Sequence, residues 1–181
     1  SRWEIRKNYE NAEELIEKAE IDALIVATGN DSHCPLTLKA LERGLHALCE
    51  KPLGLNFPEA ARMAAKAKEQ GVVSMVPFTY SFMPATRYLR ELIMDGYLGQ
   101  PYHLNMRYYG GGGRKPGYLW RFDTRRGGTG ALGDIGSHFL YIARLLFGEI
   151  VQVRAQLDRL VNRPNLDPDG MEYRKADDTA L

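Results

Sequence analysis

The sequence predicts an α/β fold, with a parallel sheet within residues 1–79 and an α+β half within residues 80–181. Two observations carry this prediction. In the first half, short apolar segments alternate with helix patterns, which is the order of the βαβ crossovers that build parallel sheets. In the second half, apolar and polar residues alternate along extended segments, which is typical of strands with one solvated face. We therefore expect a boundary between the halves near residue 79.

Capping residues delimit the helices expected in the first half. Asn11 and Asn56 each precede a helix pattern, and a glutamate follows each of them three residues later, which is an N-terminal capping signature. Another helix is expected to begin near Pro35 and to end at Gly44. Between the helices lie three short segments that we expect to form parallel strands, the first of them buried on both faces: Ala23–Ala27, His46–Cys49 and Val72–Val76.

The second half combines two helices with longer connections. Each expected helix ends at a glycine, and each expected strand has one wetter face. Two stretches read as loops because one is rich in glycine and the other in Pro, Asp and Asn. In chain order we expect a helix over residues 84–95, a strand over 102–109, a glycine-rich loop over 110–117, a helix over 137–147, a strand over 151–157 and an exposed loop over 162–175.

Composition and charge argue against several classes of protein. The 181 residues are 44% hydrophobic and 26% charged, which is the balance of a folded globular protein and not of a disordered one. A formal net charge of +1 gives no broad positive surface for nucleic acid or an anionic membrane. The longest apolar stretch, Ala23–Ala27, is far shorter than the about 20 residues that span a bilayer.

Cysteine and histidine usage bears on compartment and on metals. Cys34 and Cys49 are too few for a disulfide framework, and no secretory signal is evident, so we expect a cytoplasmic protein in which both are small buried hydrophobic residues. Four dispersed histidines without close cysteine or carboxylate partners predict no metal site. The chain opens with Ser1 and stops at Leu181 within an expected strand, so we expect it to be part of a longer protein.

Residues 128–133 form a literal G-x-G-x-x-G sequence, which in other contexts binds a dinucleotide. That motif requires an entering strand, an exiting helix and an acidic residue about 20 positions further on. The preceding residues 122–126 do not have the pattern of a buried strand, and no acidic residue closes the next strand at that distance. We therefore expect a tight loop that shapes a pocket, and not a dinucleotide fingerprint.

Three segments, taken together and in this order, resemble a known family: Ala27–His33, Leu48–Pro52 and Gly130–His138. The family is that of the Gfo/Idh/MocA oxidoreductases, which includes glucose-fructose oxidoreductase and inositol dehydrogenase. The resemblance implies a Rossmann domain without its N-terminal GxGxxG unit, followed by an incomplete α/β domain with an open, mostly antiparallel sheet. It also implies NAD or NADP as cofactor and a homo-oligomer formed through that sheet. From the charge and the short apolar stretches, we expect neither a nucleic-acid nor a membrane partner.

The same resemblance implies a catalytic set. Lys51 follows a strand and precedes Pro52, a position from which its amine could transfer a proton or polarise a substrate hydroxyl. Asp134 and His138 are four residues apart, on one face of a helix start, and a carboxylate beside an imidazole fixes its tautomer. By analogy with the family, His138 is the general base on an alcohol, while Lys51 and Asp134 assist as hydride passes to the nicotinamide.

Further residues are implied to bind cofactor or substrate. The candidate site residues also have simpler interpretations. The polar ones can be turn residues, a solvated lysine, a surface Glu–Lys pair or a helix cap, and the ring-bearing ones can be a core histidine or packed aromatic residues. Tyr80 is expected in the substrate pocket with Lys51, Asp134 and His138. The expected cofactor-binding residues are Thr28, Asn30, His33, Glu50, Lys51, Trp120 and Arg121.

The sequence thus predicts an NAD(P)-dependent dehydrogenase that acts on the CH–OH group of a sugar, a polyol or a related compound. Two alternatives stay open. One is a glycosidase or lyase on the same fold that uses NAD to oxidise, eliminate and restore. The other is a non-catalytic sugar or dinucleotide sensor. Lys51, Asp134 and His138 argue against the sensor, whereas Tyr141, which stands where the family usually has an acidic residue, argues for it.

Overall fold

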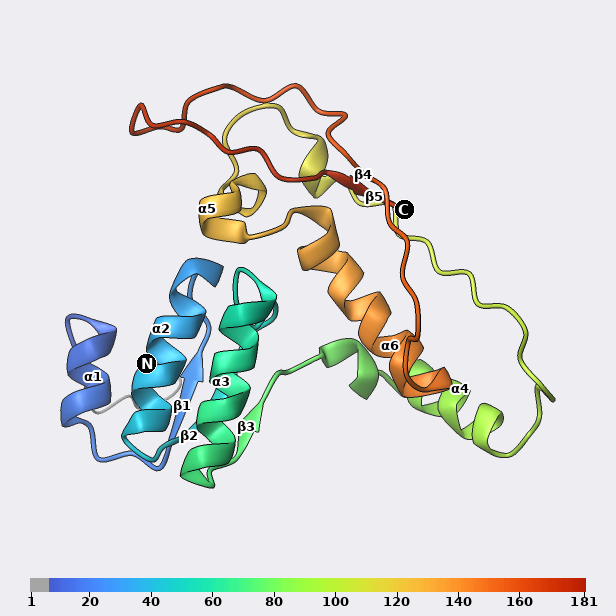
Figure 1. Ribbon diagram of the computed structural model, residues 1–181, viewed down its shortest axis with the longest axis horizontal. Helices are drawn as coiled ribbons and strands as arrows, with labels where there is room; N and C mark the ends of the chain where they lie inside the picture. Colours follow the sequence, from blue (N-terminus) through green and yellow to red (C-terminus); the bar gives the residue numbers. More distant parts are fainter. Residues whose placement is uncertain (1–6) are drawn as a thin grey trace. The chain divides into compact units, whose positions relative to one another are not determined.

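The computed structural model describes residues 7–181, which form two compact units (Figure 1). The first unit ends at Pro77 and the second runs from Phe78 to Leu181. None of the helices within residues 7–181 is long and apolar enough to cross a membrane.

The first unit is built on a three-stranded parallel sheet with the strand order β1-β2-β3. Its strands are β1 (Ala23–Val26), β2 (His46–Cys49) and β3 (Ser74–Met75). The connecting helices are α1 (Ala12–Lys18), α2 (Asn30–Glu42) and α3 (Phe57–Gln70). In the β1–β2 ladder Ala23 pairs with His46 and Val26 pairs with Cys49, so the two strands end side by side. The predicted alternation of helices and parallel strands is confirmed.

Two helices of this unit begin as the capping pattern predicts. The Asn11 side chain accepts a hydrogen bond from the amide of Glu14 at 2.8 Å, and the Asn56 side chain accepts one from Glu59 at 3.0 Å. The middle helix differs from its prediction, because α2 begins at Asn30 and contains Pro35. The Ser32 amide and hydroxyl both donate to the Gly29 carbonyl, at 2.9 and 2.8 Å, which closes the first turn ahead of the proline.

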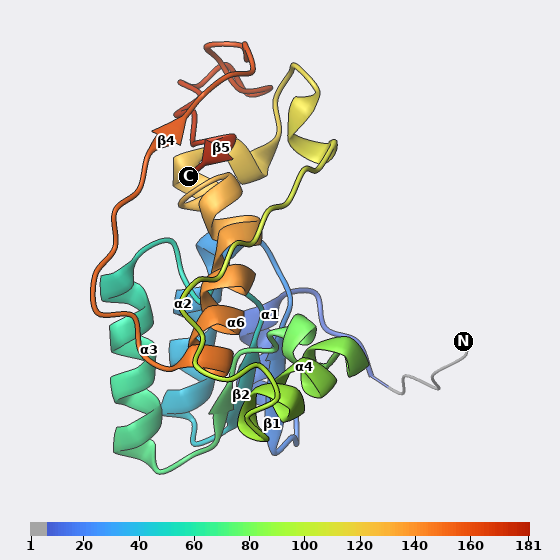
Figure 2. The ribbon, with the colours of Figure 1, turned by 90° about the vertical axis from the view of Figure 1, so that its right-hand side faces the viewer.

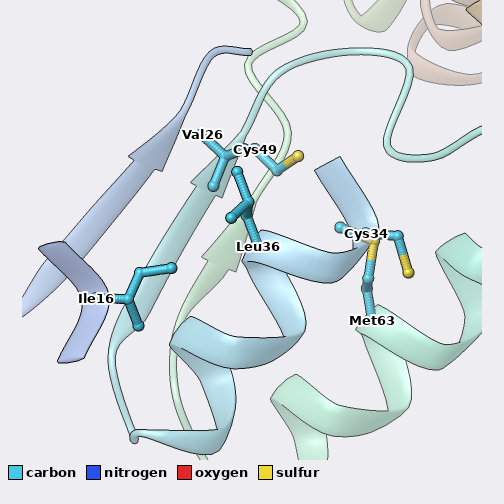
Figure 3. Close-up of a cluster of buried hydrophobic side chains, with 6 residues drawn as sticks. All are labelled: Ile16, Val26, Cys34, Leu36, Cys49 and Met63. Atoms are coloured by element: carbon cyan, nitrogen blue, oxygen red, sulfur yellow. The ribbon is translucent and has the colours of Figure 1, made fainter. Parts of the chain in front are cut away.

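The core of the first unit lies between the sheet and its helices (Figure 3). Side chains from all three helices and from β1 and β2 meet there: Ile16, Val26, Cys34, Leu36, Cys49 and Met63. Both cysteines are free and buried, as predicted, and burial raises the pKa of the Cys49 thiol to about 11. The prediction that the first strand is buried on both faces is wrong for the described residues. Val26 is 2% exposed, but Ile25 on the opposite face is 69% exposed.

The second unit is helical, with one small sheet. Its helices are α4 (Pro84–Met94), the single turn α5 (Thr124–Gly127) and α6 (Ser137–Phe147), and a π-helical turn over Leu132–Gly136 leads into α6. Shorter 3-10 turns cover Thr79–Phe82, Gly112–Arg114 and Trp120–Phe122. The strands β4 (Leu157–Asp158) and β5 (Thr179–Ala180) pair antiparallel. The helices predicted over residues 84–95 and 137–147 are confirmed, and each ends before a glycine with positive φ.

The two strands predicted in this unit are largely absent. Residues 102–109 have no regular structure, and Tyr102 and Tyr109 are 93% and 88% exposed. Of the strand predicted over residues 151–157, only Leu157 joins a ladder. A strand persists only where a neighbour satisfies its N–H and C=O groups, and within residues 7–181 nothing pairs with residues 102–109.

The prediction of an exposed loop over residues 162–175 is also wrong in part. Arg163 and Tyr173 are 4% and 3% exposed. We call residues 162–178 the C-terminal segment. Figures 1 and 2 both show this orange-red to red stretch running beside the yellow stretch that precedes α5. Isolated β-bridges join Asp123 to Lys175 and, within the segment, Leu166 to Glu172.

Candidate active site

In the first unit, the predicted cofactor residues gather at the carboxyl edge of the parallel sheet. Because β1 and β2 are parallel and end side by side, the loop with Thr28 and the loop with Glu50 and Lys51 leave the sheet at the same edge. Open parallel sheets bind their ligands at this edge. Asn30 starts α2 there, and the Glu50 amide still donates to the Val26 carbonyl at 2.9 Å.

The buried His33 side chain connects these two loops. Its side chain is 1% exposed, its Nδ1 lies 2.8 Å from the Pro52 carbonyl oxygen, and its Nε2 lies 3.2 Å from the Thr28 carbonyl oxygen. The sequence prediction placed His33 in a loop, whereas the structure places it in the first turns of α2. Both ring nitrogens face protein carbonyls, so any contribution of His33 to cofactor binding is made through the loops that it connects.

The residues around Lys51 form a short network of their own. The Lys51 amide donates to the Glu50 carboxylate at 3.1 Å, and the Lys51–Pro52 peptide bond is cis. On the neighbouring loop the Thr28 and Ser32 hydroxyl oxygens are 2.5 Å apart. Since Ser32 donates its proton to the Gly29 carbonyl, Thr28 is the donor in this pair. Lys51 and Glu50 are both half-buried, which leaves part of each side chain accessible at the edge.

In the second unit, the predicted base His138 lies in an aromatic environment. It is 6% exposed in the first turn of α6. The Tyr80 ring stacks on it with centroids 4.3 Å apart and an angle of 20° between the planes, and the Phe78 ring meets it edge-on at 5.7 Å. The structure therefore brings together two residues that the sequence could only nominate separately, Tyr80 for the substrate and His138 for catalysis.

Asp134, the predicted partner of His138, lies in the π-helical turn that leads into α6. Such turns are rare and occur frequently at functional sites. Tyr141, one turn beyond His138, stacks on Phe78 with centroids 4.3 Å apart. Tyr141 is thus part of the same aromatic cluster as His138.

Trp120 and Arg121 directly precede a buried network that the sequence prediction missed. The Arg121 guanidinium lies over the Trp120 ring, 4.4 Å from its centroid. Two residues later, the fully buried Asp123 accepts hydrogen bonds from the Arg125 backbone amide, Nε and guanidinium. The Arg125 guanidinium also pairs with Asp167 at 2.9 Å. Burial raises the pKa of Asp123, but the bonds from Arg125 outweigh it, so this pKa lies below its ordinary value.

The C-terminal segment supplies further buried polar contacts. Arg163 donates to the carbonyls of Lys115 at 3.0 Å and of Gly117 at 3.4 Å, and its guanidinium lies 4.2 Å from the centroid of the Phe122 ring. The Tyr173 hydroxyl donates to the Leu119 carbonyl at 3.1 Å. These residues were missed because a stretch rich in Pro, Asp and Asn resembles solvated loop. The signal that could have found them is an isolated aromatic residue among charged ones.

The glycine motif at residues 128–133 is not entered by a strand. The residues before it form a 3-10 turn and α5. The amides of Gly130 and Leu132 donate to the Asp177 carboxylate, at 2.9 and 2.8 Å, so two of the amides that could otherwise bind a phosphate already have an internal partner. Within residues 7–181 no group of three or more His, Cys, Asp or Glu side chains could hold a metal ion.

Comparison with known proteins gives a consistent result for both units. Residues 1–78 match the model of an oxidoreductase family with an NAD-binding Rossmann fold, and residues 86–181 match that of the GFO/IDH/MocA C-terminal domain. Levoglucosan dehydrogenase from Pseudarthrobacter phenanthrenivorans is 32% identical over 160 residues, which are 87% of this chain and 41% of that protein.

Solved structures agree. An oxidoreductase domain protein from Kribbella flavida matches 94% of this chain and 46% of its own, with 35% identity and a TM-score of 0.79. Levoglucosan dehydrogenase in complex with NADH and levoglucosan matches 99% of this chain and 48% of its own, with 28% identity and a TM-score of 0.81. The chain therefore spans less than half the length of each of these relatives. With both family models matched in sequence order and the fold reproduced, it belongs to the Gfo/Idh/MocA family of oxidoreductases.

Proposed function

We propose that the protein is an NAD(P)-dependent oxidoreductase that oxidises or reduces a carbon–oxygen centre of a sugar, a polyol or a related hydroxy compound. The observation that carries this proposal is the setting of His138, which is buried against Tyr80 at the start of α6, four residues after Asp134. Relatives named as sugar and inositol dehydrogenases, and one solved with NADH and a sugar, support the class of reaction.

The residues present fit part of a dinucleotide site. The carboxyl edge of the sheet carries a helix start at Asn30, which suits a phosphate group. It also carries the Thr28 hydroxyl, which suits ribose hydroxyl groups, and the half-buried Glu50, whose carboxylate suits hydrogen-bond donors. When bound, the nicotinamide supplies the hydride acceptor or donor. In this proposal Thr28, Asn30, Glu50 and Lys51 bind and orient it, and His33 supports their loops. Trp120 and Arg121 are proposed as further cofactor-binding residues.

His138 is proposed as the general base. The rings of Tyr80 and Phe78 pack against the His138 imidazole, which holds the ring in place and limits the access of competing water. Asp134 then orients the ring and stabilises its protonated form. Lys51 donates a hydrogen bond to the reacting oxygen, which stabilises the charge that develops on an alkoxide. Tyr80 lines the sugar pocket, where aromatic faces suit sugar C–H groups.

The test replaces His138 in the full chain. We expect His138→Ala to lower kcat by about 100-fold or more, since that is the usual contribution of a positioned base. KM for the dinucleotide should change little. The measurement is the absorbance of the reduced nicotinamide across a panel of sugars and polyols. His103→Ala is the matched control, because His103 is exposed and belongs to no site described above. Full turnover by His138→Ala would refute the assignment.

A non-catalytic sensor is the second candidate, and the stacking of Tyr141 on Phe78 favours it, because an aromatic residue occupies a position that is usually acidic in the family. Lys51→Ala separates the two candidates. An enzyme should show turnover that falls by orders of magnitude in Lys51→Ala, whereas a sensor should bind its ligand without turnover in wild type and variant alike. Product analysis distinguishes simple oxidation from an NAD-using glycosidase or lyase. A homo-oligomer stays a prediction, which light scattering tests, and a cytoplasmic location also stays a prediction.

A further inference from the structure

We propose that Asp177 is a positioning residue for the candidate active site. Its carboxylate acts as a built-in anion that holds the helix start on which Asp134 and His138 lie. The inference rests on the proposed function for the roles of those two residues. The anchoring itself rests on contacts within the second unit.

Three consecutive amides converge on this one residue. The Gly130 amide donates to Asp177 Oδ1 at 2.9 Å and the Leu132 amide donates to Oδ2 at 2.8 Å. Between them, the Ala131 amide donates to the Asp177 backbone carbonyl at 3.0 Å. Asp177 is 7% exposed, so water competes little for its oxygens. Hydrogen bonds to an ionised acceptor are roughly twice as strong as neutral ones.

These amides lie at the start of a continuous helical stretch, which comprises Ala131, the π-helical turn and α6, with Gly130 directly before it. Amides at a helix start have no partner within the helix, and the helix dipole there favours negative charge. Asp134 lies in the π-helical turn and His138 in the next turn. The direction in which this stretch leaves residues 130–132 therefore sets the position of both side chains.

Gly130 shows how closely the two chain segments fit. A Cβ atom at this position would lie 1.7 Å from the Asp177 carbonyl oxygen, so only glycine permits the contact. Gly130 and Asp177 are 47 residues apart in sequence. The close approach therefore joins the C-terminal segment to the helix start. The backbone amides of the glycine motif bind the carboxylate of Asp177.

The chain offers a matched control in the next residue. Asp178 also accepts two backbone amides, Leu160 at 2.8 Å through Oδ1 and Val161 at 2.9 Å through Oδ2. The chemistry is the same, but these amides belong to an irregular stretch that is distant in sequence from Asp134 and His138. Asp177→Ala and Asp178→Ala therefore each remove one carboxylate, from neighbouring residues. Only the Asp177 carboxylate contacts the helix start.

The experiment compares both variants in the full chain, with and without added formate, which replaces the missing carboxylate. Hydrogen exchange is measured at the amides of Gly130 and Leu132, which donate to the carboxylate. In Asp177→Ala we expect exchange there to accelerate by about tenfold or more, since a hydrogen bond to a charged group is lost. Formate should slow it again. Asp178→Ala should leave these amides unchanged. Asp177→Asn, which keeps the shape and one acceptor oxygen, serves if Asp177→Ala does not fold.

Turnover gives the second readout. We expect Asp177→Ala to lower kcat by about 100-fold, as a misplaced catalytic group does, with KM for the dinucleotide nearly unchanged and kcat partly restored by formate. Unchanged exchange in Asp177→Ala, an equal effect of Asp178→Ala, or normal kcat despite loosened amides would overturn the inference. Loss of activity in His138→Ala establishes the proposed function separately. If the wild type is inactive, that function fails, and exchange with formate rescue decides whether Asp177 holds the helix start.

Discussion

Single buried polar residues hold together the loops that carry the candidate site. His33 has both ring nitrogens on carbonyls of different loops, and Asp177 collects amides from a helix start. Such groups are costly to bury unless their partners are in place. Their side chains therefore specify loop positions more strictly than an apolar residue of the same size.

Replacement of His33 tests this at the sheet edge. We expect His33→Ala to lower the free energy of unfolding by about 1–3 kcal/mol, because buried carbonyls lose their partner. It should also raise KM for the dinucleotide more than it lowers kcat, since the loops with Thr28 and Lys51 loosen together. Chemical denaturation and steady-state kinetics measure both effects. His46→Ala, at the opposite end of β2, is the comparison. Equal KM values for His33→Ala and wild type would contradict the assigned role.

At the scale of elements, the helix start at residues 130–136 depends on the C-terminal segment and not on a local cap. Helices α1 and α3 are each capped by an asparagine side chain three residues from its partner. The stretch that leads into α6 takes its capping carboxylate from Asp177 instead. A substitution at this contact should thus disturb two distant stretches of chain.

Gly130→Ala should show this directly. The added Cβ would collide with the Asp177 carbonyl, so we expect a loss of about 3 kcal/mol or more of stability, or failure to fold. Gly111→Ala is the matched control, because its Cβ would meet nothing within 4 Å and its φ is −87°. Thermal unfolding of the two variants measures the difference. A Gly130→Ala protein as stable as Gly111→Ala would show that the close approach is not required.

At the scale of the whole molecule, the chain divides into two units with different sources of stability. The first has an apolar core between sheet and helices, whereas the C-terminal segment of the second contributes buried ionic and polar contacts. The pKa values of Asp123 and Asp167 both lie below their ordinary range. Burial raises both pKa values, but the hydrogen bonds that each carboxylate accepts from Arg125 and from backbone amides outweigh this effect.

The two units should therefore respond differently to acid. A carboxyl with a lowered folded pKa stabilises the fold above its ordinary pKa of about 4, and this contribution is lost as pH falls through the lower folded value. We expect the second unit to lose stability below about pH 4 before the first. Trp120, next to this network, reports it by fluorescence once Trp3 is replaced by phenylalanine.

Asp123→Asn should remove much of this acid step and cost about 3 kcal/mol at neutral pH, since Arg125 loses its buried partner. Asp169→Asn, at an exposed position nearby, should change neither. An acid transition that is identical in Asp123→Asn and wild type would assign it to other carboxyl groups.

Local signals in the sequence determined much of this protein. The caps of α1 and α3, the glycines that end α4 and α6, and the alternation of helices with parallel strands along the chain were all predicted. So was the sheet edge at which the loops with Thr28, Glu50 and Lys51 lie. Each of these depends on residues within a few positions of one another, or on the rule that parallel strands end together. The three family segments likewise lie in short, contiguous stretches.

Tertiary structure alone decided the rest. The burial of His33, the stacking of Tyr80 on His138 and the contact of Asp177 with Gly130 join residues from separate elements, and no local pattern encodes such partners. The predicted strand over residues 102–109 is absent for the same reason. Its alternation is a property of the sequence, but a strand forms only when a partner satisfies its backbone, and that partner is chosen by the fold.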